Sequence, residues 1–141
     1  MKDLYDAVHW HLAIPARRDR LEDLLAFVGG AAREAGMDED GQNAMLIAAE
    51  EIFINIASYS YPGGEGEVRV RLTAGPDIFE AEFRDGGTPY DPLARPDPDT
   101  SLPVEEREIG GLGIFIVKKL TDHAEYRYEN SENILLIRKK L

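Results

Sequence analysis

The sequence predicts an α+β fold: a two-layer sandwich in which helices cover one face of a mostly antiparallel, partly mixed sheet. Three observations support this fold. Two segments alternate apolar and polar residues with the period of a strand, and a tight turn separates them. Two segments before this hairpin carry apolar residues at helical spacing. A third helix and two more strand-like segments follow it, so hairpins flank that helix and the expected order is β-α-α-β-β-loop-α-β-β.

The N-terminal part of the chain predicts one strand and two helices. Residues 9–15 (HWHLAIP) are typical of a short strand that ends at a proline. Apolar residues then recur at helical spacing over residues 17–36. We expect a second helix from about residue 42 to just before Pro62, with Asp40 as its N-cap.

The second half of the chain predicts two hairpins separated by a long loop and a helix. Residues 68–74 and 78–85 alternate as half-buried strands. Residues 86–110 contain five of the eight prolines, and long loops of this kind are often functional. The glycines of GGLG then lead into an apolar helix, and two final strands are expected over residues 124–129 and 133–141.

The length, the fractions of hydrophobic and charged residues, and the net charge limit the classes of protein to which the chain could belong. The 141 residues fit one domain spanning 1–141, and 43% hydrophobic with 30% charged residues indicates a globular chain. The net charge of −11 argues against non-specific binding of nucleic acid or of an anionic membrane, because both require a cationic surface.

The absence of cysteine, of a signal-peptide pattern and of a long apolar run excludes further classes of protein. The chain has no cysteine, which excludes disulfides, Cys-ligated zinc and thiol catalysis. Its N-terminus lacks the pattern of a signal peptide, and no apolar run reaches the length of a membrane span. We therefore expect a cytoplasmic protein.

A polar line interrupts the apolar helix in AAEEIFINIASYSY. Glu51 and Asn55 are four residues apart and share one face, which Ser58 extends. No Lys or Arg occurs between Arg33 and Arg69 to pair with the carboxylate. A hard metal such as Mg²⁺ would supply the missing cation, with Asn55 as an amide ligand and Glu51 as a general base. The alternative is an exposed polar stripe on an amphipathic helix.

A second candidate element is FRDGGTPYDP, in which Asp85 ends a strand and is followed by two glycines. A carboxylate in this position can accept a hydrogen bond from an exocyclic amine such as that of adenine. Gly87 would let the ligand approach the backbone. The alternative is a plain turn, because Asp-Gly is a strong turn dipeptide.

The third candidate element is the glycine run before the late helix, which contains Gly110, Gly111 and Gly113. Glycines at a helix N-terminus expose backbone N–H groups to an anion, and the helix dipole favours the same charge. The alternative is a flexible entry to the helix. The run matches neither a P-loop nor a Rossmann fingerprint. The three elements together could surround one nucleotide, with the proline-rich loop as a lid.

These motifs resemble those of the GHKL ATPase superfamily, whose fold is shared by histidine kinases, gyrase-type topoisomerases, a heat-shock chaperone family and mismatch-repair ATPases. AAEEIFINIASYSY is similar to the N box, FRDGGTPYDP to the G1 box in its D-x-G-x-P-[FY]-D-P form, and GGLGIFIVKKLTD to the G2 box. Within the superfamily the chain most resembles the small anti-sigma factors that are also serine/threonine protein kinases. The resemblance spans nearly the whole chain and implies the Bergerat (GHKL) ATP-binding fold.

The resemblance implies a role for each residue of the first two motifs. Glu51 would be the general base, and Asn55 would ligate Mg²⁺. Asp85 would hold the adenine amine of ATP, with Gly87 beside it.

The resemblance also assigns the glycine run and the partners. Gly111 and Gly113 would frame the phosphates, and Gly110 would act as the hinge of the lid. Proteins of this subgroup transfer the γ-phosphate of ATP to a Ser or Thr of an anti-anti-sigma (STAS) protein. They also bind a sigma factor, and many form homodimers through the N-terminal strand and helix.

One departure from the subgroup bears on activity. Tyr59 and Ser60 stand where the subgroup usually has His followed by a small residue, which affects the phosphate side of the site. The alternative function is therefore a nucleotide-binding module that sequesters a sigma factor or another partner without phosphotransfer. A simple ATPase of the repair type is disfavoured, because those enzymes carry an added transducer domain.

Overall fold

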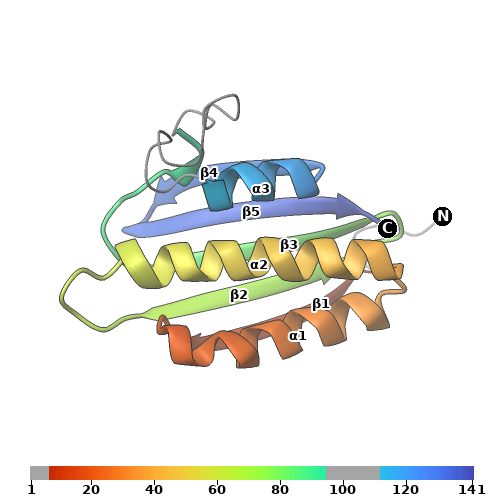
Figure 1. Cartoon of the computed structure of the whole chain (residues 1–141), viewed down its shortest axis with the longest axis horizontal. Helices are drawn as coiled ribbons and strands as arrows, with labels where there is room; N and C mark the ends of the chain where they lie inside the picture. Colours follow the sequence, from red (N-terminus) through yellow and green to blue (C-terminus); the bar gives the residue numbers. More distant parts are fainter. Residues whose placement is uncertain (1–6, 95–111) are drawn as a thin grey trace.

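The computed structural model describes residues 7–94 and 112–141, where a five-stranded sheet lies behind three α-helices (Figure 1). The predicted α+β two-layer architecture and the predicted order of elements are confirmed. The strands are β1 (Val8–Pro15), β2 (Glu67–Ala74), β3 (Ile78–Asp85), β4 (His123–Glu129) and β5 (Glu132–Lys140). The α-helices are α1 (Leu21–Glu34), α2 (Glu39–Tyr59) and α3 (Leu112–Leu120), and two 3-10 turns are η2 (Arg18–Arg20) and η3 (Pro92–Ala94).

The sheet has the strand order β1-β2-β3-β5-β4, and each neighbouring pair is antiparallel. The mixed pairing expected within the sheet does not occur among the described strands. β2 and β3 form one hairpin and β4 and β5 another. The two pairs joined by long connections, β1–β2 and β3–β5, are antiparallel as well. A single helical crossover of the βαβ type would instead have made a pair parallel.

The core lies between the sheet and the helices. On β2 the apolar residues Val68, Val70 and Leu72 are buried, whereas Arg69 and Arg71 between them are exposed, as the period of a strand requires. Helix α2 crosses the middle of the sheet with α1 on one side and α3 on the other (Figure 1). Within the described ranges no helix combines the length and the apolar character needed to cross a membrane.

Helix α2 begins earlier than predicted and has a different N-cap. Asp38 has the extended backbone of a cap residue (φ −69°, ψ 168°), and its Oδ1 accepts a hydrogen bond of 2.7 Å from the Gly41 backbone N–H. The prediction of Asp40 as the cap is wrong, because Asp40 lies inside the first helical turn. Both residues are acidic and exposed, so local sequence alone does not tell them apart.

The cap assignment predicts unequal effects of two alanine substitutions. We expect Asp38→Ala to lower the free energy of unfolding by about 1 kcal/mol, because the Gly41 N–H loses its acceptor. Asp40→Ala should lower it by only about 0.3 kcal/mol, since it removes a charge near the helix N-terminus and no cap. Urea unfolding followed by circular dichroism measures both values, and equal losses would contradict the assignment.

Candidate functional site

Glu51 lies on the flank of α2 that faces the start of α3. A Cβ atom at Gly113 would overlap the Glu51 Oε2 atom and lie 3.2 Å from its Cδ, so a larger residue here would require the Glu51 carboxylate to move. Asn55 follows one helical turn later on the same face. Both side chains are partly buried, and neither makes a hydrogen bond with another described residue. This face of α2 therefore presents a carboxylate and an amide whose polar atoms are available to a ligand.

The carboxylate of Glu51 holds its proton more firmly than an ordinary glutamate. Burial, and next the negative charge of Glu50, raise the pKa of Glu51 above its ordinary value of 4.5. A raised pKa makes a carboxylate a stronger base and suits it to proton transfer nearer neutral pH. A raised pKa is the property expected of a residue with the role predicted for Glu51, that of a general base.

The glycine run is only partly described. Gly113 lies beside Glu51, so the start of α3 and the polar face of α2 are in contact. Gly110 and Gly111 lie outside the described residues, so their predicted roles as lid hinge and phosphate contact stay predictions.

Asp85 is buried at the end of β3 and has only 3% of its surface exposed. Its Oδ1 accepts a hydrogen bond of 3.0 Å from the Gly87 N–H and one of 2.9 Å from the Asn133 side-chain amide. Both bonds from described residues use Oδ1, which leaves Oδ2 available to a further donor. A fixed carboxylate with one available oxygen is suited to bind an exocyclic amine.

Asn133 is a site residue that the sequence analysis missed. Its amide nitrogen donates to Asp85 and, at 2.9 Å, to the backbone oxygen of Thr88. Its Oδ1 accepts from the Tyr90 N–H at 3.1 Å and from the Tyr126 hydroxyl. Asn133 on β5 faces Asp85 across the β3–β5 pair, an arrangement that links residues 48 positions apart. The available signal was a polar residue at an inward position of the apolar segment NILLI.

The backbone of Ser60 leaves no room for a side chain at Gly87. A Cβ at Gly87 would overlap the backbone oxygen of Ser60 and lie 2.7 Å from the Ser60 Cβ. The same Ser60 oxygen accepts a 2.7 Å hydrogen bond from the Thr88 N–H. Close packing against the C-terminal end of α2 therefore explains this glycine, and its predicted approach to a ligand remains a prediction.

The two residues that depart from the subgroup also attach this loop to α2. The Tyr59 ring lies 5.5 Å from the Tyr90 ring, centre to centre, and Ser60 contacts Gly87. The next residue, Tyr61, donates from its hydroxyl to the Glu67 carbonyl at 2.7 Å and accepts from the Gly86 N–H at 2.8 Å. The end of α2 is thus tied to the loop that follows Asp85.

Ser58, predicted to extend the polar line, has a protein partner. The Arg18 guanidinium in η2 donates a 2.9 Å hydrogen bond to the Ser58 hydroxyl. The tertiary structure therefore brings a cation to the end of α2 that inspection of the neighbouring sequence does not reveal. This cation binds Ser58, whereas Glu51 has no ion pair with any residue in the described ranges.

The oxygen donors of Glu51 and Asn55 on α2 suit a hard cation whose other ligands come from the phosphates of a bound nucleotide. Across residues 7–94 and 112–141, no group of three or more His, Asp or Glu side chains could hold a metal ion. Mg²⁺ commonly binds few protein groups, retains water and takes its other ligands from a nucleotide. The Asn55 amide oxygen, with the Glu51 carboxylate one turn away, offers oxygen donors of the right kind for such a shared site.

Comparisons with known proteins identify the family and the fold. A family profile described as a histidine kinase-like ATPase domain matches residues 14–139. The chain is 26% identical over 130 residues to the serine-protein kinase RsbW of Listeria monocytogenes, covering 89% of this chain and 83% of the relative. It is also 26% identical over 129 residues to the serine-protein kinase RsbW of Bacillus cereus, covering 89% and 81%.

A solved structure supports the fold independently. The crystal structure of the RsbU and RsbW domains of Rv1364c from Mycobacterium tuberculosis is similar to this chain with a TM-score of 0.64. The match covers 95% of this chain and 32% of that longer chain at 15% sequence identity. At this identity the likeness concerns the fold alone.

The raised pKa of Glu51 predicts a pH-dependent effect of Glu51→Gln on stability. A raised folded-state pKa means that protonation favours folding, so this contribution is present below about pH 4.5 and is lost as pH rises through the folded pKa. Glu51→Gln should therefore be more stable than wild type at pH 7, and the difference should disappear below about pH 4. Urea unfolding of both proteins at the two pH values measures this. A variant that is less stable at pH 7 would contradict the burial of the charge.

The packing of Gly87 against Ser60 predicts that two neighbouring glycines differ in tolerance. We expect Gly87→Ala to lower the free energy of unfolding by about 1–3 kcal/mol, because backbone atoms of Ser60 must move. Gly86→Ala is the matched control, since its Cβ would meet only the Tyr61 hydroxyl at 4.0 Å. It should change stability by less than about 0.5 kcal/mol. Thermal or urea unfolding tests the pair, and comparable losses would refute the packing argument.

Proposed function

The chain belongs to the histidine kinase-like ATPase domain family, and from this premise we propose that it binds ATP with Mg²⁺ and is an anti-sigma factor with serine/threonine protein kinase activity. One observation supports the proposal most directly. The available carboxylate of Glu51 and the amide of Asn55 lie between Gly113 of α3 and the end of α2, which contacts the loop after Asp85. These groups could hold the two ends of one nucleotide.

In the proposed reaction each residue has a separate task. Asp85, oriented by Asn133, accepts a hydrogen bond from the adenine amine. Asn55 holds Mg²⁺, which when bound neutralises phosphate charge. Glu51 accepts the proton of the attacking Ser or Thr hydroxyl while the bond between the γ-phosphorus and the leaving oxygen breaks and ADP departs. The raised pKa of Glu51 favours this proton transfer.

The proposed acceptor is a Ser or Thr of an anti-anti-sigma (STAS) protein, and the proposed regulatory target is a sigma factor. The RsbW relatives of Listeria monocytogenes and Bacillus cereus, named serine-protein kinases, support this class of reaction. We further propose a single domain over residues 1–141 that acts in the cytoplasm as a homodimer, without binding nucleic acid or membrane. The net charge of −11 supports the last point.

A second candidate function is nucleotide-dependent sequestration of a partner without phosphotransfer. Tyr59 favours it, because this side chain offers no cation to a phosphate and its ring packs on Tyr90 instead. Under this alternative, nucleotide binding would be unchanged and only the transfer step would be missing.

Isothermal titration with ATP and Mg²⁺ tests nucleotide binding. Wild type should bind with a saturable signal, and Asp85→Asn should weaken binding by at least about tenfold, because a donor then faces the adenine amine. Asp85→Asn keeps the Oδ1 acceptor for Gly87 and Asn133, so the fold should persist. Asn55→Ala should lose binding or its Mg²⁺ dependence. If wild type does not bind ATP, both candidate functions fail.

Phosphotransfer to a STAS protein then separates the two functions, with Glu51→Gln as the control. We expect transfer of radiolabelled γ-phosphate by wild type and a loss of about 10²–10⁴-fold in Glu51→Gln with ATP binding retained. Binding without transfer by wild type would support the sequestration function.

A further inference from the structure

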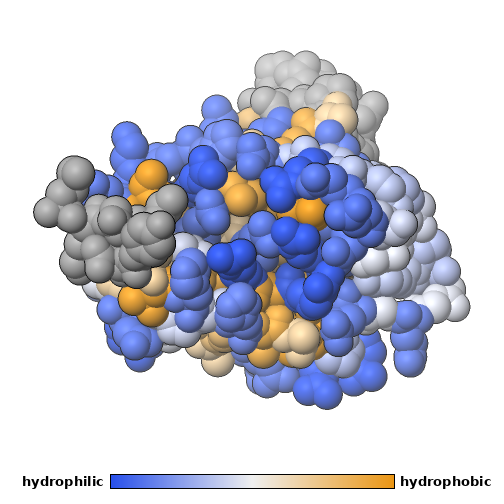
Figure 2. All heavy atoms as spheres, turned by 180° about the vertical axis from the view of Figure 1, so that it is seen from behind, coloured by the Kyte–Doolittle hydropathy of each residue, from blue (hydrophilic) through white to orange (hydrophobic). Residues whose placement is uncertain are grey.

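The face of the sheet opposite the helices is mostly hydrophilic, with several hydrophobic patches between the polar residues (Figure 2). The alternation of each strand places on this face the residues between the core positions. On the three strands nearest the β1 edge these include His11, Arg69, Arg71, Glu82 and Arg84. Arginines thus gather on one face of a chain whose net charge is −11.

Most charges on this face are paired, some within one strand and others between strands. The Arg84 guanidinium contacts Glu82 at 2.6 Å and Glu132 at 3.7 Å, and Arg69 also pairs with Glu132. Arg138 contacts Glu80 at 2.9 Å. These pairs neutralise one another locally, so they do not by themselves create a binding site.

Arg71 is the exception. It lies between His11 and Glu82 in the strand register, but its guanidinium has no ion pair or hydrogen bond with any described residue. Glu82, its cross-strand neighbour, is 9% exposed and is bound to Arg84. The positive charge of Arg71 is therefore available on a surface where the nearest carboxylate is already neutralised.

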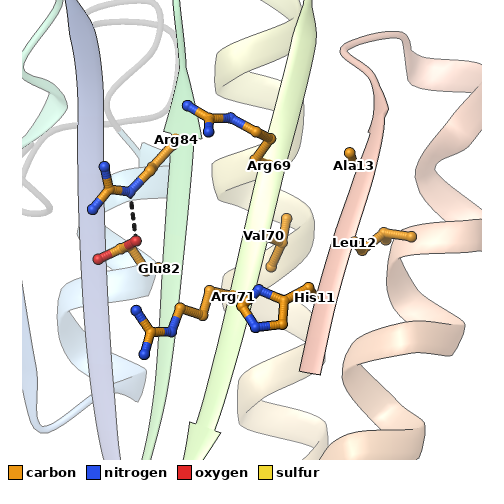
Figure 3. Close-up of a pocket in the computed structure, with 8 residues that line it drawn as sticks. All are labelled: His11, Leu12, Ala13, Arg69, Val70, Arg71, Glu82 and Arg84. Carbon is orange, nitrogen blue, oxygen red and sulfur yellow. Dashed lines mark hydrogen bonds and ion pairs between the residues drawn. The ribbon is translucent and has the colours of Figure 1, made fainter. Parts of the chain in front are cut away.

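A hollow of about 330 Å³ lies at this position, between β1 and β3 (Figure 3). Figure 3 shows the guanidinium groups of Arg69, Arg71 and Arg84 around it, with only Arg84 and Glu82 joined within the set drawn. The small side chain of Ala13 on β1 leaves room beside them. Half of the Arg69 side chain is also exposed.

We propose that this hollow binds an extended acidic segment of a partner protein. Arg69 and Arg71 are two residues apart on β2, so their side chains leave the sheet on the same side about 7 Å apart. Alternate side chains of an extended peptide have the same spacing, so one carboxylate would pair with Arg71. The next carboxylate would share the half-exposed Arg69 guanidinium with Glu132. A nucleic acid fits less well, because Glu67 and Glu80 on the same face and the net charge of −11 repel a continuous polyanion.

The test is an NMR titration of the ¹⁵N-labelled full chain with a peptide of alternating glutamate and glycine. We expect shifts of backbone signals on β1, β2 and β3 around the hollow, and none with the matching glutamine peptide or with oligothymidylate. Raising NaCl from about 25 mM to about 500 mM should abolish the shifts, because salt screens exposed charges. Shifts that are absent, lie elsewhere, or also occur with the oligonucleotide would overturn the proposal.

Two arginine variants locate the binding. Arg71→Gln should weaken peptide binding by about fivefold, whereas Arg127→Gln, which removes an exposed arginine already paired with Glu129 on β4 of the same face, should leave it unchanged. Arg71→Gln should still bind ATP like wild type, so failure here and failure of the proposed function are distinguishable. Equal peptide binding by wild type and Arg71→Gln refutes the site. Without peptide, the proposed homodimer would give concentration-dependent shifts on β1 and α1. If such shifts instead centre on β2 and β3 around the hollow, they would assign this face to a second copy and overturn the proposal.

Discussion

The hydrogen bonds of the buried Asn133 amide join the parts on which the candidate site depends. This side chain links the end of β3 through Asp85, the following loop through Thr88 and Tyr90, and β4 through Tyr126. Asp85 is buried, and a buried carboxylate is unfavourable without hydrogen-bond donors, which Asn133 and the Gly87 N–H supply. Because both donors bind the same oxygen, the network orients the carboxylate and leaves its other oxygen available.

Helix α2 turns this local network into an extended site. Its apolar side packs on the sheet, so its polar flank must face α3 and the surrounding solvent. Two glycines permit close approach at either end of that flank: Gly113 beside Glu51 and Gly87 beside Ser60. A side chain at Gly87 would collide with the Ser60 backbone and push α2 away from this loop, whereas one at Gly113 would displace the Glu51 carboxylate. The geometry of the candidate site is therefore a consequence of how closely α2 is packed.

The two faces of the sheet have different physical characters. The face under the helices supplies the core, and the candidate site lies along its central helix. The opposite face carries ion pairs within and between strands, and the Arg71 side chain has no partner among the described residues. Since the sheet separates the two faces, nucleotide chemistry and a contact with a partner protein could act without direct interference.

The sequence by itself determined the elements and most of the motif residues. Period-two and helical patterns depend on residues only a few positions apart, so the strands and helices could be predicted, together with the placement of Glu51 and Asn55 on a helix and of Asp85 at a strand end. Tertiary structure alone decided that Asn133 supports Asp85, that Arg18 binds Ser58 and that Gly87 packs on Ser60. The tertiary structure also shows that Asp38, and not Asp40, is the N-cap of α2. These outcomes depend on which distant segments meet, and local periodicity carries no information about that.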